Sequence, residues 1–558
     1  MKLFSFLSKK EYVAFVALIV LFLAVRIPGV SLPYHQDEWK TAWALKTETG
    51  LSSLHHPPLT QIFFNIDGAL FGADHLRIFP LLISIIVAIL LFVVTKNRVG
   101  TKNAFFSLGL FTVCAYSVFA SLMVDTDGAI LPVFFLLAVY FYDKFKNVEG
   151  KRVYKWLILL ALALTLGFMT KLSFVIAIGA IILDFIIDRY KSITRKQASV
   201  AILALLGFFG LSSFLILFTR LIYPTFDIGS MISHAASYAH LEGRNYFQSM
   251  IQGVKSLYYL SPLLLAPLFF INAEIFRRMR VFFLYLFLGF IFYFILFDFS
   301  AGALDKYLMF AIVPLSAITG TIFNNFFKVV SMRRGHTIFF GAFVCLLLLS
   351  LNFFPHDVIA LYPKTEWFSR VIHLKWQIFN PFTGGNGPMG FYVSFLFIGA
   401  TFFISAMVAL LAIVKREWRS AACLIILMIG VMYNTVFIEE MLFGKINGSA
   451  PEVLAQTINF INKSPDITQV ITYNDSGAYE LSKAGKYAGR FYAVPAYEEG
   501  HRKLFSGFDG NYMIIDIPHL YETGFYGEFF KKCTRIFETR SGQIGGYVFK
   551  CPRVSDAV

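Results

Sequence analysis

Charged residues are scarce in this sequence. Of its 558 residues only 15% are Asp, Glu, Lys or Arg, whereas 57% are hydrophobic and 18% are aromatic. The mean hydropathy is +0.66, and soluble globular domains by contrast carry about 25% charged residues. This scarcity excludes a soluble globular protein and predicts a polytopic membrane protein.

Cysteine and repeated patterns are scarce as well. No two cysteines form a metal-type C-x-x-C pair, and three of the five lie inside apolar segments. The other two, Cys533 and Cys551, can either form a disulfide or remain free thiols.

We find no internal repeat and none of the inverted-repeat symmetry of transporters. No small-residue cleavage site follows the apolar stretch 1–30, so we expect a retained signal-anchor helix there.

Apolar windows long enough to cross a hydrocarbon core of about 30 Å run through the first 442 residues. We expect about thirteen transmembrane helices. They lie near residues 11–30, 78–96, 104–123, 128–143, 156–170, 172–187, 199–222, 257–275, 281–297, 307–327, 337–354, 390–414 and 420–441. The two segments that flank Lys171 are short, so a broken or re-entrant hairpin is an alternative there.

The formal net charge of +15 reflects the loops between these segments. Lys and Arg concentrate in alternate loops, as expected of loops on the cytoplasmic side. We therefore predict a cytoplasmic N-terminus, a plasma-membrane location and no nucleic-acid partner. The opposite, outer side of the membrane is predicted to contain the first loop at 31–77, Asp125-Thr126-Asp127, Lys171 and the stretch from Asp298 to Lys306.

The composition changes after Leu442, where apolar runs shorten and polar residues and glycines become frequent. The patterns predict short helices and strands in alternation. Helices are expected at 451–461 and 477–484, and strands at 469–473, 512–517 and 547–550. We therefore predict a transmembrane catalytic domain over 1–442 and a small extracytoplasmic α/β domain over 443–558.

The first outer loop is unusually long, and long loops tend to be functional. Asp37 and Glu38 follow the first span directly, where carboxylates are costly unless water, a cation or a reacting group compensates them. Trp39 and Trp43 are spaced as on a helix lying at the level of the lipid headgroups. At the start of that helix, Asp37 can serve as a general base toward a hydroxyl or amine, or can simply cap the helix.

Several fragments, in this order, resemble the GT-C glycosyltransferases, and above all the protein O-mannosyltransferase and lipid A aminoarabinose transferase families. Asp37-Glu38, His55-His56-Pro57-Pro58 and Arg77-Ile78-Phe79-Pro80 resemble the Asp-Glu, His-Pro-Pro and Arg-x-Pro motifs of these families, with one extra residue in the last. Gly167-Phe168-Met169-Thr170-Lys171 resembles their Gly-Phe-x-Thr-Lys, and Asp305-Lys306-Tyr307 resembles their basic-Tyr turn. The likeness covers roughly residues 1–330.

The resemblance implies an enzyme that transfers a sugar from a polyprenyl phosphate to a lipid, glycan or protein acceptor at the outer face of the membrane. It implies that Asp37 is the catalytic base and Glu38 its supporting neighbour. The residues it implies for substrate binding are His56, Arg77, Lys171, Lys306 and Tyr307. Charge supports the two lysines independently, because a departing lipid phosphate needs cationic partners. The alternative for each lysine is snorkelling at a span end. No covalent nucleophile is evident, so we expect inversion at the anomeric carbon.

Asp125 and Asp127 stand at the outer mouth of a hairpin. They could share a divalent Mg or Mn cation that bridges phosphate oxygens, or could form only a polar turn. The pair resembles an acidic motif of metal-dependent oligosaccharyltransferases, yet the chain lacks their Trp-Trp-Asp motif. We expect no required cofactor, because the mannosyltransferase-like branch commonly works without metal. Two other classes remain as alternatives, a transporter or flippase of lipid-linked precursors and a sensor or assembly scaffold.

Overall fold

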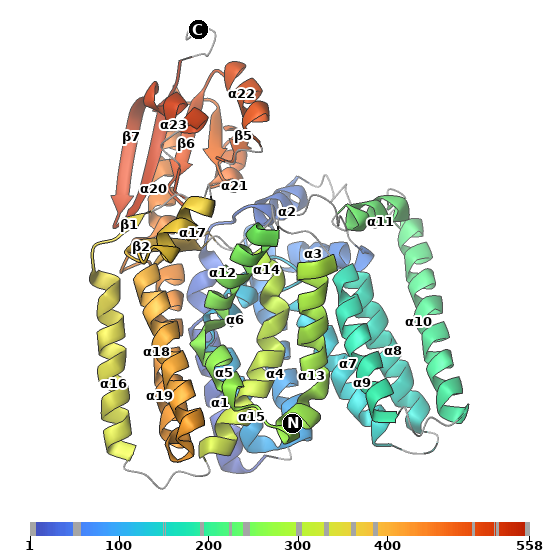
Figure 1. The fold of residues 1–558 in the computed structure, drawn as a ribbon. Coiled ribbons are helices and arrows are strands. Elements are labelled where there is room, and N and C mark those ends of the chain that lie inside the picture. The colour runs from blue at the N-terminus through green and yellow to red at the C-terminus, as the bar shows by residue number, and fades with distance from the viewer. Residues whose placement is uncertain are drawn as a thin grey trace. The chain divides into compact units, whose positions relative to one another are not determined.

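The computed structural model is mainly helical (Figure 1). It divides into two compact units, which we describe separately. The first comprises Met1–Val30, Ala44–Arg333 and Val408–Leu427, and the second Ser31–Trp43, Arg334–Met407 and Met428–Val558. The residues that the structure describes are 7–47, 57–148, 150, 152–189, 195–222, 226–237, 246–296, 304–327, 334–358, 364–382, 389–493, 497–517, 519–520 and 524–552.

The first unit is built from helices. Helix α5 packs against α4 and α15, and α8 packs against α7 and α10. The helices are α1 (Lys9–Ala24), α3 (Pro58–Phe71), α4 (Ile78–Val99), α5 (Thr101–Val113), α6 (Ala115–Leu122), α7 (Ile130–Lys146), α8 (Arg152–Thr170), α9 (Val175–Arg189), α10 (Arg195–Ile222), α11 (Ile228–Ala236), α12 (Tyr246–Leu265), α13 (Ala273–Ile291), α14 (Leu304–Tyr307) and α15 (Ile312–Phe327).

Each predicted membrane segment contains helix, although the segment 390–414 begins in strand β3 (Phe391–Ser394) and 257–275 crosses from α12 to α13. In the described part of the chain, ten helices are long and apolar enough to cross a membrane, or up to eleven if the bent pair α5 and α6 forms one span. The remaining difference from about thirteen comes from α7 and α9, which are only 17 and 15 residues long. The predicted polytopic helical fold is therefore confirmed.

The break between α5 and α6 bends the chain by 68° at Cys114. A break of this kind frees helix carbonyls that must find other donors inside a membrane. The buried guanidinium of Arg26 supplies them, donating to the carbonyl oxygens of Phe111 at 3.3 Å and Thr112 at 3.1 Å. It also donates to the hydroxyl oxygens of Ser117 and Ser121. Arg26 was not among the residues predicted from the sequence.

Before its C-terminal part, the second unit contains helical segments and a small sheet. It includes α16 (Arg334–Ser350) and α17 (Lys364–Ile372), the first part of α2 (Asp37–Lys46) and of α18 (Phe395–Val414), and the last part of α19 (Arg419–Leu442). The sheet has the order β1-β2-β3, with strands β1 (Asp357–Val358), β2 (Ile378–Phe382) and β3 (Phe391–Ser394).

The C-terminal part is an α/β domain around a five-stranded sheet, seen as the red arrows of Figure 1. The strand order is β5-β4-β6-β8-β7, in which β4 pairs in parallel with β5 and β6, and β8 pairs antiparallel with β6 and β7. The strands are β4 (Val470–Tyr473), β5 (Tyr487–Phe491), β6 (Asn511–Ile515), β7 (Thr534–Ser541) and β8 (Ile544–Lys550), and the helices are α20 (Ala450–Lys463), α21 (Ala478–Lys483), α22 (Glu498–Ser506) and α23 (Gly524–Lys531).

Apolar side chains cover both faces of this sheet. Along β6, Tyr512 and Ile514 enter one buried cluster and Met513 and Ile515 the other. Successive residues of a strand point to opposite faces, so a strand buried on both sides is continuously apolar. The predicted strands corresponding to β4, β6 and β8 and the predicted helices corresponding to α20 and α21 are confirmed, whereas β5, β7, α22 and α23 were not predicted.

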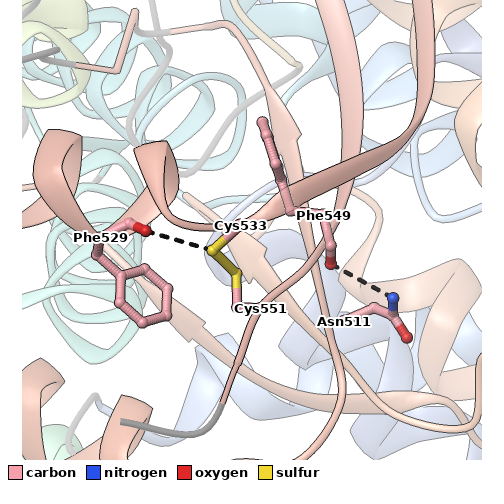
Figure 2. The surroundings of a disulfide bond; sticks show 5 residues. All are labelled: Asn511, Phe529, Cys533, Phe549 and Cys551. Atoms are coloured by element: carbon pink, nitrogen blue, oxygen red, sulfur yellow. Dashed lines mark hydrogen bonds between the residues drawn. A yellow bond between two sulfur atoms is a disulfide. The ribbon is translucent and has the colours of Figure 1, made fainter. Parts of the chain in front are cut away.

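A disulfide joins Cys533, after α23, to Cys551, after β8 (Figure 2). It closes a loop between residues 18 positions apart. Nearby, the Asn511 side-chain amide donates to the carbonyl oxygen of Phe549 at 3.3 Å. Of the two alternatives that the sequence left open for these cysteines, the structure has the disulfide.

Candidate active site

The turn that carries Asp125 and Asp127 connects α6 to α7. The Asp125 carboxylate accepts hydrogen bonds from the backbone N–H groups of Thr126 at 2.5 Å and Asp127 at 3.4 Å. Gly128 ends the turn against α6, where a Cβ atom would overlap the carbonyl oxygen of Ala120. The close approach requires glycine, and it fixes both carboxylates at the end of α6.

Two lysines from distant parts of the chain meet these carboxylates. Lys171 follows α8 and forms an ion pair with Asp127, and Lys306 in α14 forms an ion pair with Asp125. The Lys306 and Asp127 side chains are only 5% exposed. The turn after α8 depends on Gly167, because a Cβ atom there would overlap the ring of Phe174.

Tyr307 lies between the two lysines. The Nζ atoms of Lys171 and Lys306 lie 4.9 Å and 5.3 Å from the centroid of its ring, which stacks on Tyr293 at 5.8 Å. Five residues that the sequence singled out separately thus form one group. We call Asp125, Asp127, Lys171, Lys306 and Tyr307 the charged cluster. Its two carboxylates and two ammonium groups balance in formal charge.

The charges of the cluster keep both lysines protonated. Burial by itself lowers the pKa of a lysine ammonium. Here the neighbouring carboxylates outweigh burial, chiefly Asp127 for Lys171 and Asp125 for Lys306, and the pKa of each lysine is raised. Both lysines therefore offer cations to an anionic ligand.

The cluster does not provide the usual ligand set of a metal site. Among the described residues, no group of three or more His, Cys, Asp and Glu side chains is arranged to hold a metal ion. Asp125 and Asp127 each face a lysine ammonium instead, and that positive charge opposes a divalent cation at the same place. As arranged, these residues do not fit a Mg or Mn site.

Arg77 and α3 support the neighbourhood of the cluster. The fully buried Arg77 donates from Nη1 to the carbonyl oxygen of Leu122 at 2.6 Å, at the last residue of α6. The Thr60 hydroxyl in α3 donates to the carbonyl oxygen of Thr170 at 2.5 Å, one residue before Lys171. The predicted substrate-binding residue His56 lies outside the described residues.

Asp37 and Glu38, in the second unit, differ sharply in exposure. Asp37 is the first residue of α2, its side chain is 52% exposed, and it forms an ion pair with Lys40 at 2.7 Å. Glu38 is fully buried, and its carboxylate accepts the backbone N–H of His35 at 3.4 Å. An exposed carboxylate can reach an acceptor, and a buried one can hold the turn that precedes it.

The C-terminal ends of the parallel strands hold this turn. Asn474, directly after β4, accepts a hydrogen bond from the Gln36 side-chain amide at 3.3 Å, and its own amide lies 3.5 Å from Nε2 of His35. Gln36, Asn474 and Asp475 have left-handed backbone angles, with φ of 48°, 57° and 59°. Such conformations in residues other than glycine cluster at functional sites.

Aromatic contacts reinforce the same attachment. Tyr34 packs edge-on against Tyr479 at 5.2 Å, and Trp39 packs against Tyr487 at 5.0 Å. Trp39 is 9% exposed, so the expectation that it faces lipid headgroups was wrong. The spacing of the two tryptophans correctly indicated a helix, but the apolar surface that buries Trp39 belongs to a strand more than 400 residues later.

The chain is a multi-span membrane protein with a fold of the GT-C type. The fold is similar to that of ArnT from Cupriavidus metallidurans bound to undecaprenyl phosphate, with a TM-score of 0.57 and 11% identity over 97% of this chain and 98% of that chain. The apo state of that protein matches with a TM-score of 0.53 and 13% identity over 96% and 97% of the two chains.

Residues 55–216 match the family model described as dolichyl-phosphate-mannose-protein mannosyltransferase. No curated protein matches this sequence. The resemblance to GT-C enzymes inferred from the sequence is confirmed in the fold and in the family match over residues 55–216.

Proposed function

We propose that this chain transfers a sugar from a polyprenyl-phosphate donor to an acceptor. The observation that carries the proposal is the charged cluster, in which the ammonium groups of Lys171 and Lys306 and the ring of Tyr307 gather from two separate segments of a membrane protein. ArnT, which has a similar fold, was solved with undecaprenyl phosphate, and we extend that class of ligand to this chain.

In the proposed reaction the lysines receive the leaving group. An arriving phosphate monoester or diester competes with the carboxylates of Asp125 and Asp127 for the ammonium groups of Lys306 and Lys171. Charge-assisted hydrogen bonds from cations stabilise the negative charge that grows on the phosphate as its bond to the sugar breaks. The cations are already assembled before the donor binds, so the main reorganisation is the exchange of their carboxylate partners for the phosphate.

Asp37 is proposed as the general base. Its carboxylate takes the proton of the acceptor hydroxyl, the acceptor oxygen bonds to the anomeric carbon, and the phosphate departs with the electrons of the broken bond. A single displacement of this kind inverts the anomeric centre. Glu38 supports the base through the backbone of His35. No metal takes part in these steps.

We further propose that the chemistry takes place at the outer face of the plasma membrane, with the N-terminus in the cytoplasm. The alternation of basic loops supports this orientation. The disulfide between Cys533 and Cys551 supports an extracytoplasmic C-terminal domain independently, because disulfides persist in oxidising compartments.

The alternatives are less well supported. A transporter needs charged groups along a path through the membrane. Asp184, in α9, is instead bound to Arg280 at 2.6 Å and to the Tyr142 hydroxyl at 2.7 Å, so its charge is compensated within the structure. A metal-dependent oligosaccharyltransferase needs carboxylates that bind the metal, whereas Asp125 and Asp127 here form ion pairs with Lys306 and Lys171.

The test is a transfer assay with labelled polyprenyl-phosphate sugar and the full-length protein in detergent. Asp37→Asn should lower the rate by about 10²-fold or more, the contribution typical of a general base. Asp74→Asn is the matched control, because Asp74 is another exposed aspartate of the first outer loop, paired with Lys46 at 3.8 Å. Equal activity in the two variants would remove Asp37 from the mechanism.

Two further arms separate the alternatives. A chelator should leave the wild-type rate unchanged, and a chelator-sensitive rate would assign a metal to the enzyme. If the wild type turns over no polyprenyl-linked donor at all, the transporter or the scaffold is favoured over an enzyme.

A further inference from the structure

A pocket of about 460 Å³ opens on the C-terminal domain. Its lining residues come from the end of β5 and from α22, and they are Arg490, Tyr492, Tyr497, Gly500 and His501. Ligand sites in sheets with parallel strands gather at the carboxyl ends of those strands, and Tyr492 directly follows β5. The volume lies in the range of small-molecule sites.

One buried carboxylate organises two walls of the pocket. Asp475 is fully buried and forms an ion pair with Arg490. It also accepts hydrogen bonds from the hydroxyl groups of Tyr492 at 2.8 Å and Tyr487 at 3.3 Å. These bonds fix the guanidinium and the Tyr492 ring in place before any ligand arrives, which lowers the entropy lost on binding.

The other walls are aromatic and uncharged. The ring of Tyr497 is 51% exposed and lies 6.2 Å from the ring of His501. The hydroxyl of Tyr526 pairs with Nδ1 of His501 at 2.7 Å, and burial lowers the pKa of the imidazole. The imidazole is therefore neutral at physiological pH and can exchange hydrogen bonds with a hydroxyl group through its second nitrogen.

This combination selects a class of ligand. None of the described lining residues is aliphatic, so a lipid tail has no complementary wall. The charge of Arg490 is balanced by Asp475, so the pocket does not attract a polyanion strongly. Aromatic rings with polar edges, a planar donor and a neutral imidazole match a sugar ring, which presents C–H faces and hydroxyl edges.

We infer that this pocket is a subsite for a saccharide acceptor. The inference rests on the proposed function and gives the C-terminal domain a role in it. Burial and Asp475 raise the pKa of the Tyr492 phenol, and the negative charge of the Asp37 carboxylate adds to this effect. Asn474, the neighbour of Asp475, accepts a hydrogen bond from Gln36. The subsite and the proposed base are thus parts of one structural unit.

The experiment applies the full-length protein in detergent to a printed array of neutral and anionic oligosaccharides beside an array of peptides. We expect the wild type to retain a subset of saccharides and Tyr497→Ala to lose roughly tenfold in that signal, the size expected for one aromatic stacking contact. Lys503→Ala is the control, because this residue of α22 is 80% exposed and does not line the pocket.

The outcomes distinguish the subsite from the proposed function. Saccharide retention that is equal in the wild type and Tyr497→Ala overturns the subsite, and so does retention of peptides alone. Retention that depends on Tyr497 in a protein without donor turnover upholds the subsite and overturns the proposed function. Asp37→Asn should bind the array like the wild type while it loses transfer.

Discussion

Removing Lys306 tests whether the charged cluster serves structure, chemistry or both. The side chains of Lys306 and Asp125 are 5% and 15% exposed, so Lys306→Gln leaves a largely buried carboxylate without its cation. Such a loss costs about 3–5 kcal/mol in the free energy of unfolding. In the double variant Asp125→Asn, Lys306→Gln both charges are gone, and most of that cost should be recovered.

Donor binding separates the two roles. If Lys306 contacts the lipid phosphate, the single and the double variant should both show a higher KM for the donor, although only the single variant is unstable. Stability is measured by denaturant titration of the full-length protein in detergent, and KM by the labelled-donor assay. Lys503→Gln, at an ion pair with Glu499 that is 80% and 88% exposed, is the control and should cost less than about 1 kcal/mol.

Two results would refute this reasoning. A double variant that regains both stability and donor affinity would make Lys306 a structural partner of Asp125 only. A single variant no less stable than the Lys503→Gln control would mean that the pair is not buried from solvent as the structure has it.

Three other changes give sharp expectations. Asn474→Ala should lower kcat by roughly tenfold, with little change in donor KM or thermal stability, because it loosens the turn before Asp37. Asn474→Asp keeps the hydrogen-bond acceptor for Gln36 and should restore much of the rate. Equal losses of kcat in both variants would argue against a positioning role for Asn474. Asp67 is fully buried, neither of its carboxylate oxygens has a hydrogen-bond partner among the described residues, and burial raises its pKa to about 8. The folded chain thus keeps a proton that the unfolded chain releases near pH 4. Between about pH 4 and about pH 8, the free energy of unfolding of the wild type should therefore fall by about 1.4 kcal/mol per pH unit relative to that of Asp67→Asn. A difference between the two proteins that does not depend on pH would contradict this. Cys533→Ser should destabilise the C-terminal domain by about 3 kcal/mol, as measured by its thermal midpoint with and without reductant; a reductant effect that persists in the variant would point to another cause.

The membrane helices could be predicted because burial in lipid imposes a long apolar run on each of them. The exact number of spans could not, since α7 and α9 carry the same apolar composition over fewer residues. The strands β4 and β6 were recognisable as apolar runs. By contrast, β7 is largely exposed or half-buried, so it lacks the apolar pattern that identifies a buried strand.

The members of the charged cluster could be found in the sequence, but their partners could not. Asp127 and Lys171 are 44 residues apart, and two close aspartates are equally suited to a metal ion or to two cations. Whether the aspartates bind a metal or a lysine depends on which side chains the folded helices place beside them. Lys306 lies far from both aspartates in the sequence. Arg26 and Asp67 were missed for a related reason, because a single charged residue at the end of a span or in an amphipathic helix carries no periodic signal.

The position of Arg26 has a practical consequence for shortening or relocating the first helix. That helix is more than an anchor, since its terminal guanidinium binds the backbone oxygens freed where α5 breaks from α6. A chain expressed without it would leave those carbonyls in an apolar environment without a donor, at several kcal/mol each. The segment that begins at α6 carries Asp125 and Asp127, so trimming the N-terminus would act on the charged cluster from about a hundred residues away.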